Sequence, residues 1–141
     1  MARDPKVDLL AQVSLFARCS PKELKHIASL VDQVKVPDGH VLIEVGQAAK
    51  EAFVIVEGEA EVTGADEVFN TVGAGTVIGE MALLDHTLTR SATVTATTDM
   101  TLLVIGPREF DALIHKHPEV LRGIAAELAR RLAVADKRLL G

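Results

Sequence analysis

Four side chains or backbone positions in the segment 78–91 could together hold a small ligand that carries both a sugar and a phosphate. Gly79 lets backbone approach a ligand closely, and a short helical turn after it would offer free N–H groups to an anion. Arg90 can form charge-assisted hydrogen bonds to a phosphate, and Ser91 can add a hydroxyl donor. When ionised, Glu80 can only accept hydrogen bonds and carries a negative charge, so it suits a sugar hydroxyl and would repel a phosphate.

The elements that must position these residues change from helical to β along the chain. Apolar residues between 7 and 15 follow helical spacing, and Ser20 with Glu23 forms a capping-box signal at the start of a second helix. From Gln33 to Gly106 the pattern becomes short β-branched runs cut by glycines, which predicts strands and turns. The predicted strands are 41–45, 53–56, 60–63, 68–72, 92–97 and 101–105.

Helical signals return after Gly106. Pro107 opens a predicted helix through about His115, and Pro118 starts another. The last helix carries apolar residues at coiled-coil-like spacing, which would either pack on the strands or form a dimer contact. These residues are Leu121, Leu128 and Ala135 in one row and Ala125, Leu132 and Leu139 in the next.

The fold predicted from this pattern is mainly β with flanking helices (α+β), an antiparallel β-roll or jelly roll. Parallel βαβ units are excluded because the gaps between strands are too short for crossover helices. We expect a single domain over residues 1–141, with N-terminal helices at 1–32 and a long C-terminal helix closing the segment 107–141. The β-roll takes residues 33–106 and contains the ligand segment 78–94.

Composition limits the function. The chain has 141 residues and a net charge of −5, which argues against direct nucleic acid binding across its surface. Cys19 is the single cysteine, and the sequence has neither a signal peptide nor an apolar run long enough for a membrane helix, so we expect a cytoplasmic protein. The serines and histidines carry no recognised catalytic motif, so we expect no enzyme activity.

The order of residues in the ligand segment resembles the phosphate-binding cassette of cyclic-nucleotide-binding domains. Gly-Glu-Met-Ala-Leu-Leu is followed by Arg-Ser-Ala-Thr-Val, and the distance from Glu80 to Arg90 is similar to that of the bacterial catabolite-activator branch. The resemblance extends from about Val13 to Lys137, including the stretches "ELKHIA", "VPDGHVLIEVGQ", "FVIVEGEAEV" and "ELARRLAVADKR".

The resemblance implies a role for each matching residue. Glu80 and the Gly79 backbone would hold the ribose 2′-hydroxyl, within a cassette that includes Met81. Arg90 would pair with the phosphate oxygens, helped by Ser91 and the Ala82 N–H. The purine side of the pocket would be lined by Val62, Phe69 and Val72, and Arg131 on the final helix would sit near Glu80.

The base preference is where the sequence departs from the family. The catabolite activator reads the adenine amino group with a Thr-Ser pair, and the matching positions here are Ala135 and Asp136. Asp136 could accept a hydrogen bond from adenine or guanine, or be a solvated surface acid. The ligand is therefore cAMP or cGMP, with cAMP favoured, and we expect no further cofactor.

Other interpretations of the same residues remain open. Glu80 and Arg90 could form an ion pair that only ties a turn to a strand, or the roll could have lost its ligand. Gly73, Gly75 and Gly79 resemble a dinucleotide fingerprint, but a hairpin turn explains them better because no full helix follows. His115 and His117 are two positions apart and share no helix face, so we expect no metal site.

The expected function is that of a small stand-alone sensor that signals through its final helix to an unknown effector protein, with a possible homodimer and no membrane contact. In relatives that are transcription factors a helix-turn-helix domain follows this helix; the sequence here ends at Gly141, so we expect no such domain. The alternatives are a sensor fragment of a transcription regulator, channel or enzyme, and a ligand-free interaction module.

Overall fold

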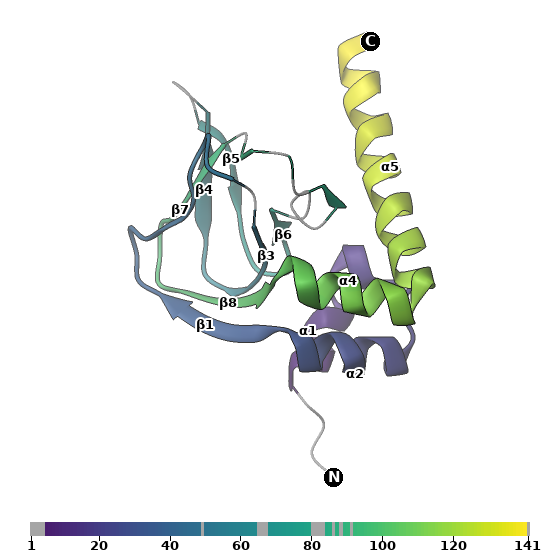
Figure 1. Cartoon of the computed structure of the whole chain (residues 1–141). Coiled ribbons are helices and arrows are strands. Elements are labelled where there is room, and N and C mark those ends of the chain that lie inside the picture. The colour runs from purple at the N-terminus through teal and green to yellow at the C-terminus, as the bar shows by residue number, and fades with distance from the viewer. Residues whose placement is uncertain are drawn as a thin grey trace. The chain divides into compact units, whose positions relative to one another are not determined.

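The structure, a computed structural model, contains two compact units, one built from strands and one from helices (Figure 1). It describes residues 5–48, 50–64, 68–79, 84–85, 87, 89–90 and 92–140, with the side chains of all of these except residues 14, 68, 69, 131 and 135–140. The strand unit is Leu30–Asp111, and the helical unit combines Met1–Ser29 with Ala112–Gly141. The division into mainly β structure and flanking helices confirms the predicted fold class.

The strand unit consists of two antiparallel four-stranded sheets. One sheet has the order β1-β8-β3-β6 and the other the order β2-β7-β4-β5, so neighbours in space are mostly distant in sequence. The strands are β1 (Asp32–Val36), β2 (Val41–Ile43), β3 (Ala52–Glu57), β4 (Ala60–Thr63), β5 (Val68–Val72), β6 (Val77–Ile78), β7 (Thr93–Ala96) and β8 (Met100–Ile105).

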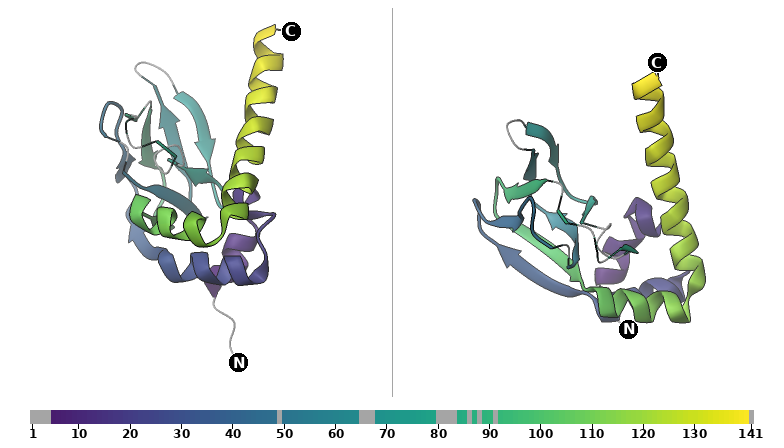
Figure 2. Two further views of the ribbon diagram at one scale, coloured as in Figure 1. Left: turned by 45° about the vertical axis from the view of Figure 1, so that its right-hand side comes forward. Right: turned by 45° about the horizontal axis from the view of Figure 1, so that its top comes forward.

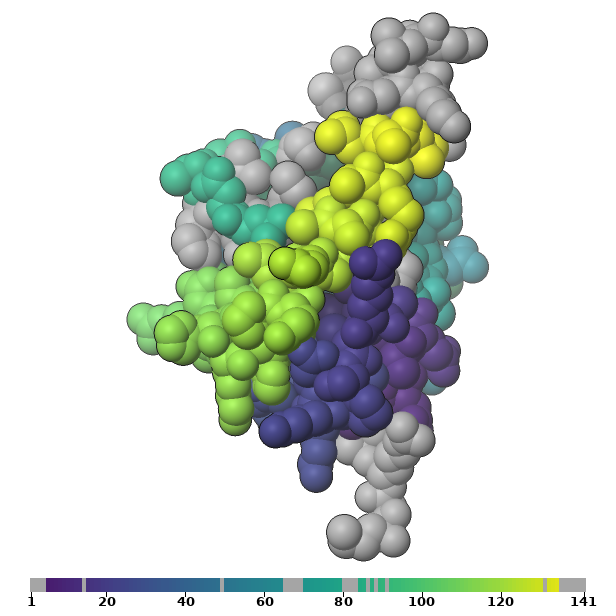
Figure 3. Space-filling model, turned by 90° about the vertical axis from the view of Figure 1, so that its right-hand side faces the viewer, coloured from purple at the N-terminus to yellow at the C-terminus, as the bar shows by residue number. Residues whose placement is uncertain are grey.

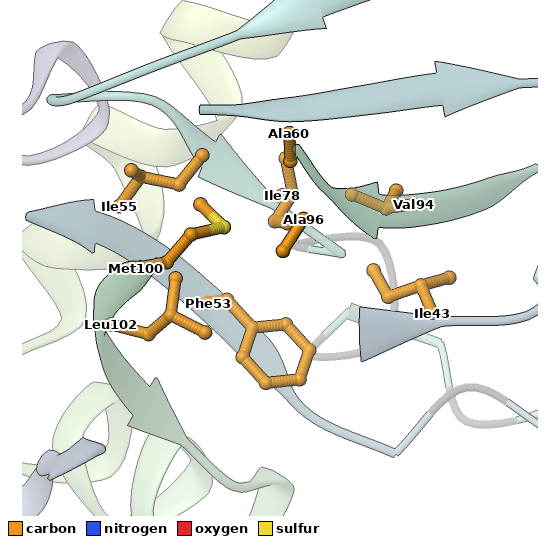
Figure 4. Packing of buried hydrophobic residues seen from close by; sticks show 9 residues of the cluster. All are labelled: Ile43, Phe53, Ile55, Ala60, Ile78, Val94, Ala96, Met100 and Leu102. Carbon is orange, nitrogen blue, oxygen red and sulfur yellow. The ribbon is translucent and has the colours of Figure 1, made fainter. Parts of the chain in front are cut away.

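Apolar side chains from both sheets form the interior of the roll (Figure 4). On β7 the pattern alternates, with Val94 and Ala96 buried and Thr93 and Thr95 half-buried, as expected for a strand with one face on a core. Nine buried residues make up this roll core: Ile43, Phe53, Ile55, Ala60, Ile78, Val94, Ala96, Met100 and Leu102.

The glycine-rich turn after β5 differs from the prediction. Gly73 and Gly75 do form a turn, in which Thr76 N donates to the carbonyl of Gly73. The turn is not a hairpin, because β5 pairs with β4 in one sheet while β6 pairs with β3 in the other. A tight turn fixes only the local direction of the chain, so the same turn chemistry serves a hairpin or a crossing between sheets.

The helical unit contains α1 (Pro5–Ala11), the 3₁₀ turn η1 (Ser14–Phe16), α2 (Pro21–Leu30) up to Ser29, the second half of α4 (Pro107–Lys116) and α5 (Pro118–Leu140). The capping box is confirmed: Ser20 N donates to Glu23 Oε1 at 2.7 Å, and Glu23 N donates to Ser20 Oγ at 3.2 Å. The single helical spacing predicted from residue 7 to 15 is too long, since α1 ends at Ala11.

A sharp bend separates α4 from α5 (Figure 2). Pro118 lacks a backbone N–H and disfavours helical dihedrals at the residue before it, so α4 ends at Lys116 and a new helix starts at Pro118. Val120 and Ile124 are the buried residues of the first turns of α5, whereas Leu121, Leu132 and Val134 are 37%, 63% and 51% exposed.

Candidate functional site

The backbone of Arg90 is fixed by the turn that follows β2. Arg90 N donates to the Gln47 carbonyl, and the Arg90 carbonyl accepts from Gly46 N, both at 2.8 Å. Immediately before it, Thr89 forms an isolated antiparallel bridge with Ala48. The arginine is therefore held on both sides by backbone hydrogen bonds, and its side chain starts from a defined position.

The Arg90 guanidinium is held by two backbone carbonyls. Nη2 donates to the Glu51 carbonyl at 2.7 Å, and Nη1 donates to the Gly79 carbonyl at 3.4 Å. Burial lowers the pKa of Arg90 and the Glu51 carboxylate opposes that shift, yet an arginine stays charged. This is a partly desolvated cation oriented by neutral acceptors, so a good part of its charge is available to an anion.

Gly79 is required at its position for two reasons. Its φ is +77°, a conformation that residues with a Cβ rarely adopt. A Cβ placed there would lie 2.8 Å from Arg90 Nη1 and 3.0 Å from the Glu51 carbonyl oxygen. The absence of a side chain at residue 79 thus lets the guanidinium reach both carbonyls.

A cavity of about 340 Å³ opens beside the guanidinium. Its volume lies within the range that small-molecule sites occupy. Its polar lining comes from Arg90, Gln47, Lys50 and Glu51, and its apolar lining includes Leu42, Ile43 and Phe53. The cavity therefore combines a cationic end with an apolar side, which suits an anionic ligand with a flat or apolar part.

The apolar side of the cavity continues into the roll core. Ile43 and Phe53 line the cavity and also belong to that core (Figure 4). Val62 and Val72, which the sequence placed on the purine side, are half-buried and pack against the same core. Val62 is paired with Val94 across β4 and β7. The fold thus connects the Arg90 end to the predicted apolar wall through shared core residues.

Several predicted site residues cannot be compared with this geometry. Glu80, Met81, Ala82 and Ser91 lie outside the described residues. Phe69 is on β5, and Arg131 and Asp136 are on α5, but these three side chains lie outside the described part of the structure as well. Their roles stay predictions from the sequence.

Sequence reasoning missed the residues that hold Arg90 through their backbone. Gln47 and Glu51 contribute carbonyl oxygens, and every residue type has one, so no side-chain pattern could have pointed to them. The one signal in the sequence was the glycine at position 46, which indicates a turn. In the structure Gly46 has a φ of +86°, and its turn returns the chain beside Arg90. Leu42, Ile43 and Phe53 were recognisable as strand residues, though not as cavity lining.

Other candidate chemistry is weak within the described residues. No group of three or more His, Cys, Asp or Glu side chains there could hold a metal ion. Burial, with a contribution from Glu23, raises the pKa of the Cys19 thiol to about 11, so at neutral pH it is protonated and a poor nucleophile. No helix in the described part of the chain is long and apolar enough to cross a membrane.

Relatives of this chain have diverse names but share one domain. A cyclic nucleotide-gated potassium channel of Mesorhizobium japonicum is 34% identical over 126 residues, which cover 89% of this chain and 33% of the channel. The cAMP-activated global transcriptional regulator CRP of Escherichia coli is 32% identical over 110 residues, covering 74% of this chain and 52% of the regulator. The chain thus spans between a third and about half of these relatives.

Solved structures agree with the fold. The Thermus thermophilus catabolite activator protein superposes with a TM-score of 0.81 at 30% identity, covering 89% of this chain and 61% of that chain. The family model described as "Cyclic nucleotide-binding domain" matches residues 33–117, which is more than half of the sequence and includes the whole cavity around Arg90. The chain belongs to the cyclic nucleotide-binding domain family.

Proposed function

We propose that the chain binds cAMP in preference to cGMP and acts as a cytoplasmic, non-catalytic sensor whose response is transmitted by α5. The observation that carries this proposal is the Arg90 guanidinium, partly desolvated and held by two backbone carbonyls at one end of a cavity with an apolar side. A cyclic phosphate carries one negative charge that matches this cation. The attached purine is flat and matches the apolar wall.

The apolar wall of the pocket favours adenine over guanine as the base of the ligand. Val62, Val72, Ile43 and Phe53 offer no side-chain hydrogen-bonding groups. Guanine presents one more N–H donor group and a carbonyl on the edge where adenine has a single amino group, so placing guanine against this wall leaves more polar groups unpaired. The name of the CRP relative, which is activated by cAMP, agrees with this preference.

A second possibility is that the sensor works within a larger protein. The matched residues make up 33% of a cyclic nucleotide-gated potassium channel and 52% of a cAMP-activated transcriptional regulator, so in these relatives the domain is part of a larger protein. A ligand changes an output only through different affinities for two states of the protein, and α5 is the element through which we propose the two states differ. The output is a transcription regulator, channel, enzyme or separate effector protein.

Calorimetric titration of the purified chain with cAMP and cGMP tests the ligand. We expect micromolar or tighter binding of cAMP and weaker binding of cGMP. 2′-Deoxy-cAMP serves as a further ligand, and it should bind more weakly than cAMP if Glu80 holds the ribose hydroxyl. No heat and no thermal stabilisation with either nucleotide would contradict the proposal and indicate a roll that functions as a ligand-free interaction module.

We also propose that α5 forms a homodimer through an exposed apolar stripe. Leu121, Ala125, Leu128 and Leu132 follow steps of four, three and four residues, the spacing of a coiled-coil seam. Leu121 and Leu132 are 37% and 63% exposed, so the stripe is open to a second helix.

Light scattering on the Leu132→Glu variant tests the dimer. A buried carboxylate in the seam should shift the chain to monomer at concentrations where the parent is dimeric. Val134→Glu is the matched control, because Val134 is on the same helix and 51% exposed but lies off the stripe. Equal masses for the two variants would contradict a seam through Leu132.

A further inference from the structure

Charge is divided unevenly between the two compact units. The helical unit, residues 1–29 and 112–141, contains eleven Lys and Arg against six Asp and Glu, a net charge of +5. The strand unit, residues 30–111, contains four against fourteen, a net charge of −10. The helical unit is therefore basic although the whole chain has a net charge of −5.

Five of the basic residues belong to neighbouring elements of the helical unit, whose surface is seen in Figure 3. His26 of α2 and His117 at the α4–α5 bend pack edge to face with ring centroids 5.2 Å apart, which places α2 beside that bend. The Arg18 Cβ lies 3.7 Å from where a Cβ on Gly123 would be, so the turn before α2 contacts the start of α5. We call the following five residues the basic face: Arg18, Lys22, Lys25, Lys116 and Arg122.

All five side chains of the basic face are exposed. Among the described residues none of the five takes part in an ion pair. Two nearby acids are already engaged: Glu23 accepts a hydrogen bond from Ser20 N in the capping box, and Glu127 pairs with Arg130. A third acid, the exposed Glu119, lies in the first turn of α5 between Lys116 and Arg122, so the face keeps a net positive charge with five cations against one unengaged carboxylate.

His26 reports the positive potential at this place. Desolvation lowers the pKa of His26, and the positive charges of Lys116 and His117 lower it further. Its Nδ1 is buried and has no hydrogen-bond partner in the described structure. An imidazole is neutral or cationic, so His26 adds no negative charge to this region. The cations of α2 and of the α4–α5 bend thus act on a common region.

We propose that the basic face is a docking surface for an acidic protein segment, rich in Asp and Glu. Exposed cations from three helices and the turn before α2 give a complementary surface that would steer such a segment and fix its register. A nucleic acid is less well matched. The chain has neither Trp nor Tyr, and the described phenylalanines Phe16, Phe53 and Phe110 are buried, so none of them is exposed for a base to stack on.

Nuclear magnetic resonance titration of the full chain with an oligoglutamate peptide tests the proposal. We expect amide shift changes concentrated in residues 18–29 and 116–123, with affinity that falls as salt is raised. Lys22→Glu combined with Lys25→Glu should weaken binding by roughly fivefold or more, since two attractive charges become repulsive. The matched control is Lys35→Glu combined with Arg108→Glu, which makes the same charge change at two exposed positions of the strand unit.

The two double variants separate local docking from overall charge. Weaker binding in the basic-face variant alone supports the proposal. Equal weakening in both variants, or shift changes spread over the strand unit, would overturn it. An oligonucleotide of equal charge, or vesicles containing an anionic phospholipid, that binds the parent more tightly than the peptide would also overturn it, because the face would then serve a nucleic acid or a membrane.

Discussion

Replacing Arg90 by Glu should weaken cAMP binding by roughly 30-fold to several thousand-fold. The substitution places a carboxylate where the phosphate is expected, and removing one partner of a desolvated charge pair costs about 2–5 kcal/mol. It also removes the donor of both hydrogen bonds to the Glu51 and Gly79 carbonyls. Isothermal titration calorimetry of parent and variant measures the change directly.

Two further variants show whether the loss reflects the site. Arg108→Glu makes the same change in net charge at an exposed position in the first turn of α4, and it should bind cAMP like the parent. Arg90→Lys keeps the charge but loses the planar pair of donors, so it should fall between the parent and Arg90→Glu. Undiminished binding by a folded Arg90→Glu variant would show that the phosphate is bound elsewhere.

The strands that sequence predicted best are those with apolar or β-branched runs between turn residues. The bounds of β4 and β5 match the predicted runs 60–63 and 68–72, and the predicted run 101–105 is β8 without its first residue. Two strands were missed. The sequence of β1, Asp-Gln-Val-Lys-Val, has four exposed residues and pairs with β8 at the edge of its sheet, and β6 has only two residues. Neither carries a periodicity long enough to detect.

The pairing of strands could not be predicted from local patterns. β3 lies between β8 and β6, and β7 lies between β2 and β4, so each sheet assembles segments from both halves of the roll. Turn residues limit where the chain reverses, but burial of the apolar faces decides which strands become neighbours. The hairpin predicted at Gly73 and Gly75 was wrong for this reason.

Some features of the site could likewise be predicted from residue types, and others could not. The sequence alone pointed to Arg90 and Gly79, because a charge and the lack of a Cβ are properties of the residue types themselves. The carbonyls of Gln47 and Glu51 that hold Arg90 are 43 and 39 positions away from it, and only the folded chain brings them beside it. The family match to residues 33–117 supports a cyclic nucleotide as the ligand. The geometry supports the Arg90 end of the cavity as the place where we propose that its phosphate binds.

Gly79→Ala should weaken cAMP binding by roughly tenfold or more while the roll remains folded. The new methyl group would lie 2.8 Å from Arg90 Nη1 and 3.0 Å from the Glu51 carbonyl oxygen. The guanidinium is the end of a flexible side chain and the carbonyl is backbone, so the guanidinium is expected to move. Once it moves, the phosphate loses a charge-assisted hydrogen bond, which contributes about 1.5–3 kcal/mol.

Gly75→Ala provides the matched control for this substitution. Gly75 has a φ of +88°, close to the +77° of Gly79, but a Cβ placed at Gly75 would have no described heavy atom within 4 Å outside its chain neighbours. The left-handed backbone should cost each variant about 1–2 kcal/mol of stability, measured by denaturant unfolding without ligand. Gly79→Ala should lose further stability, because its Cβ also displaces the Arg90 guanidinium from the Glu51 and Gly79 carbonyls. If Gly79→Ala alone loses affinity, the position of the Arg90 guanidinium determines binding. Equal affinities would mean that the phosphate does not depend on the Gly79–Arg90 contact.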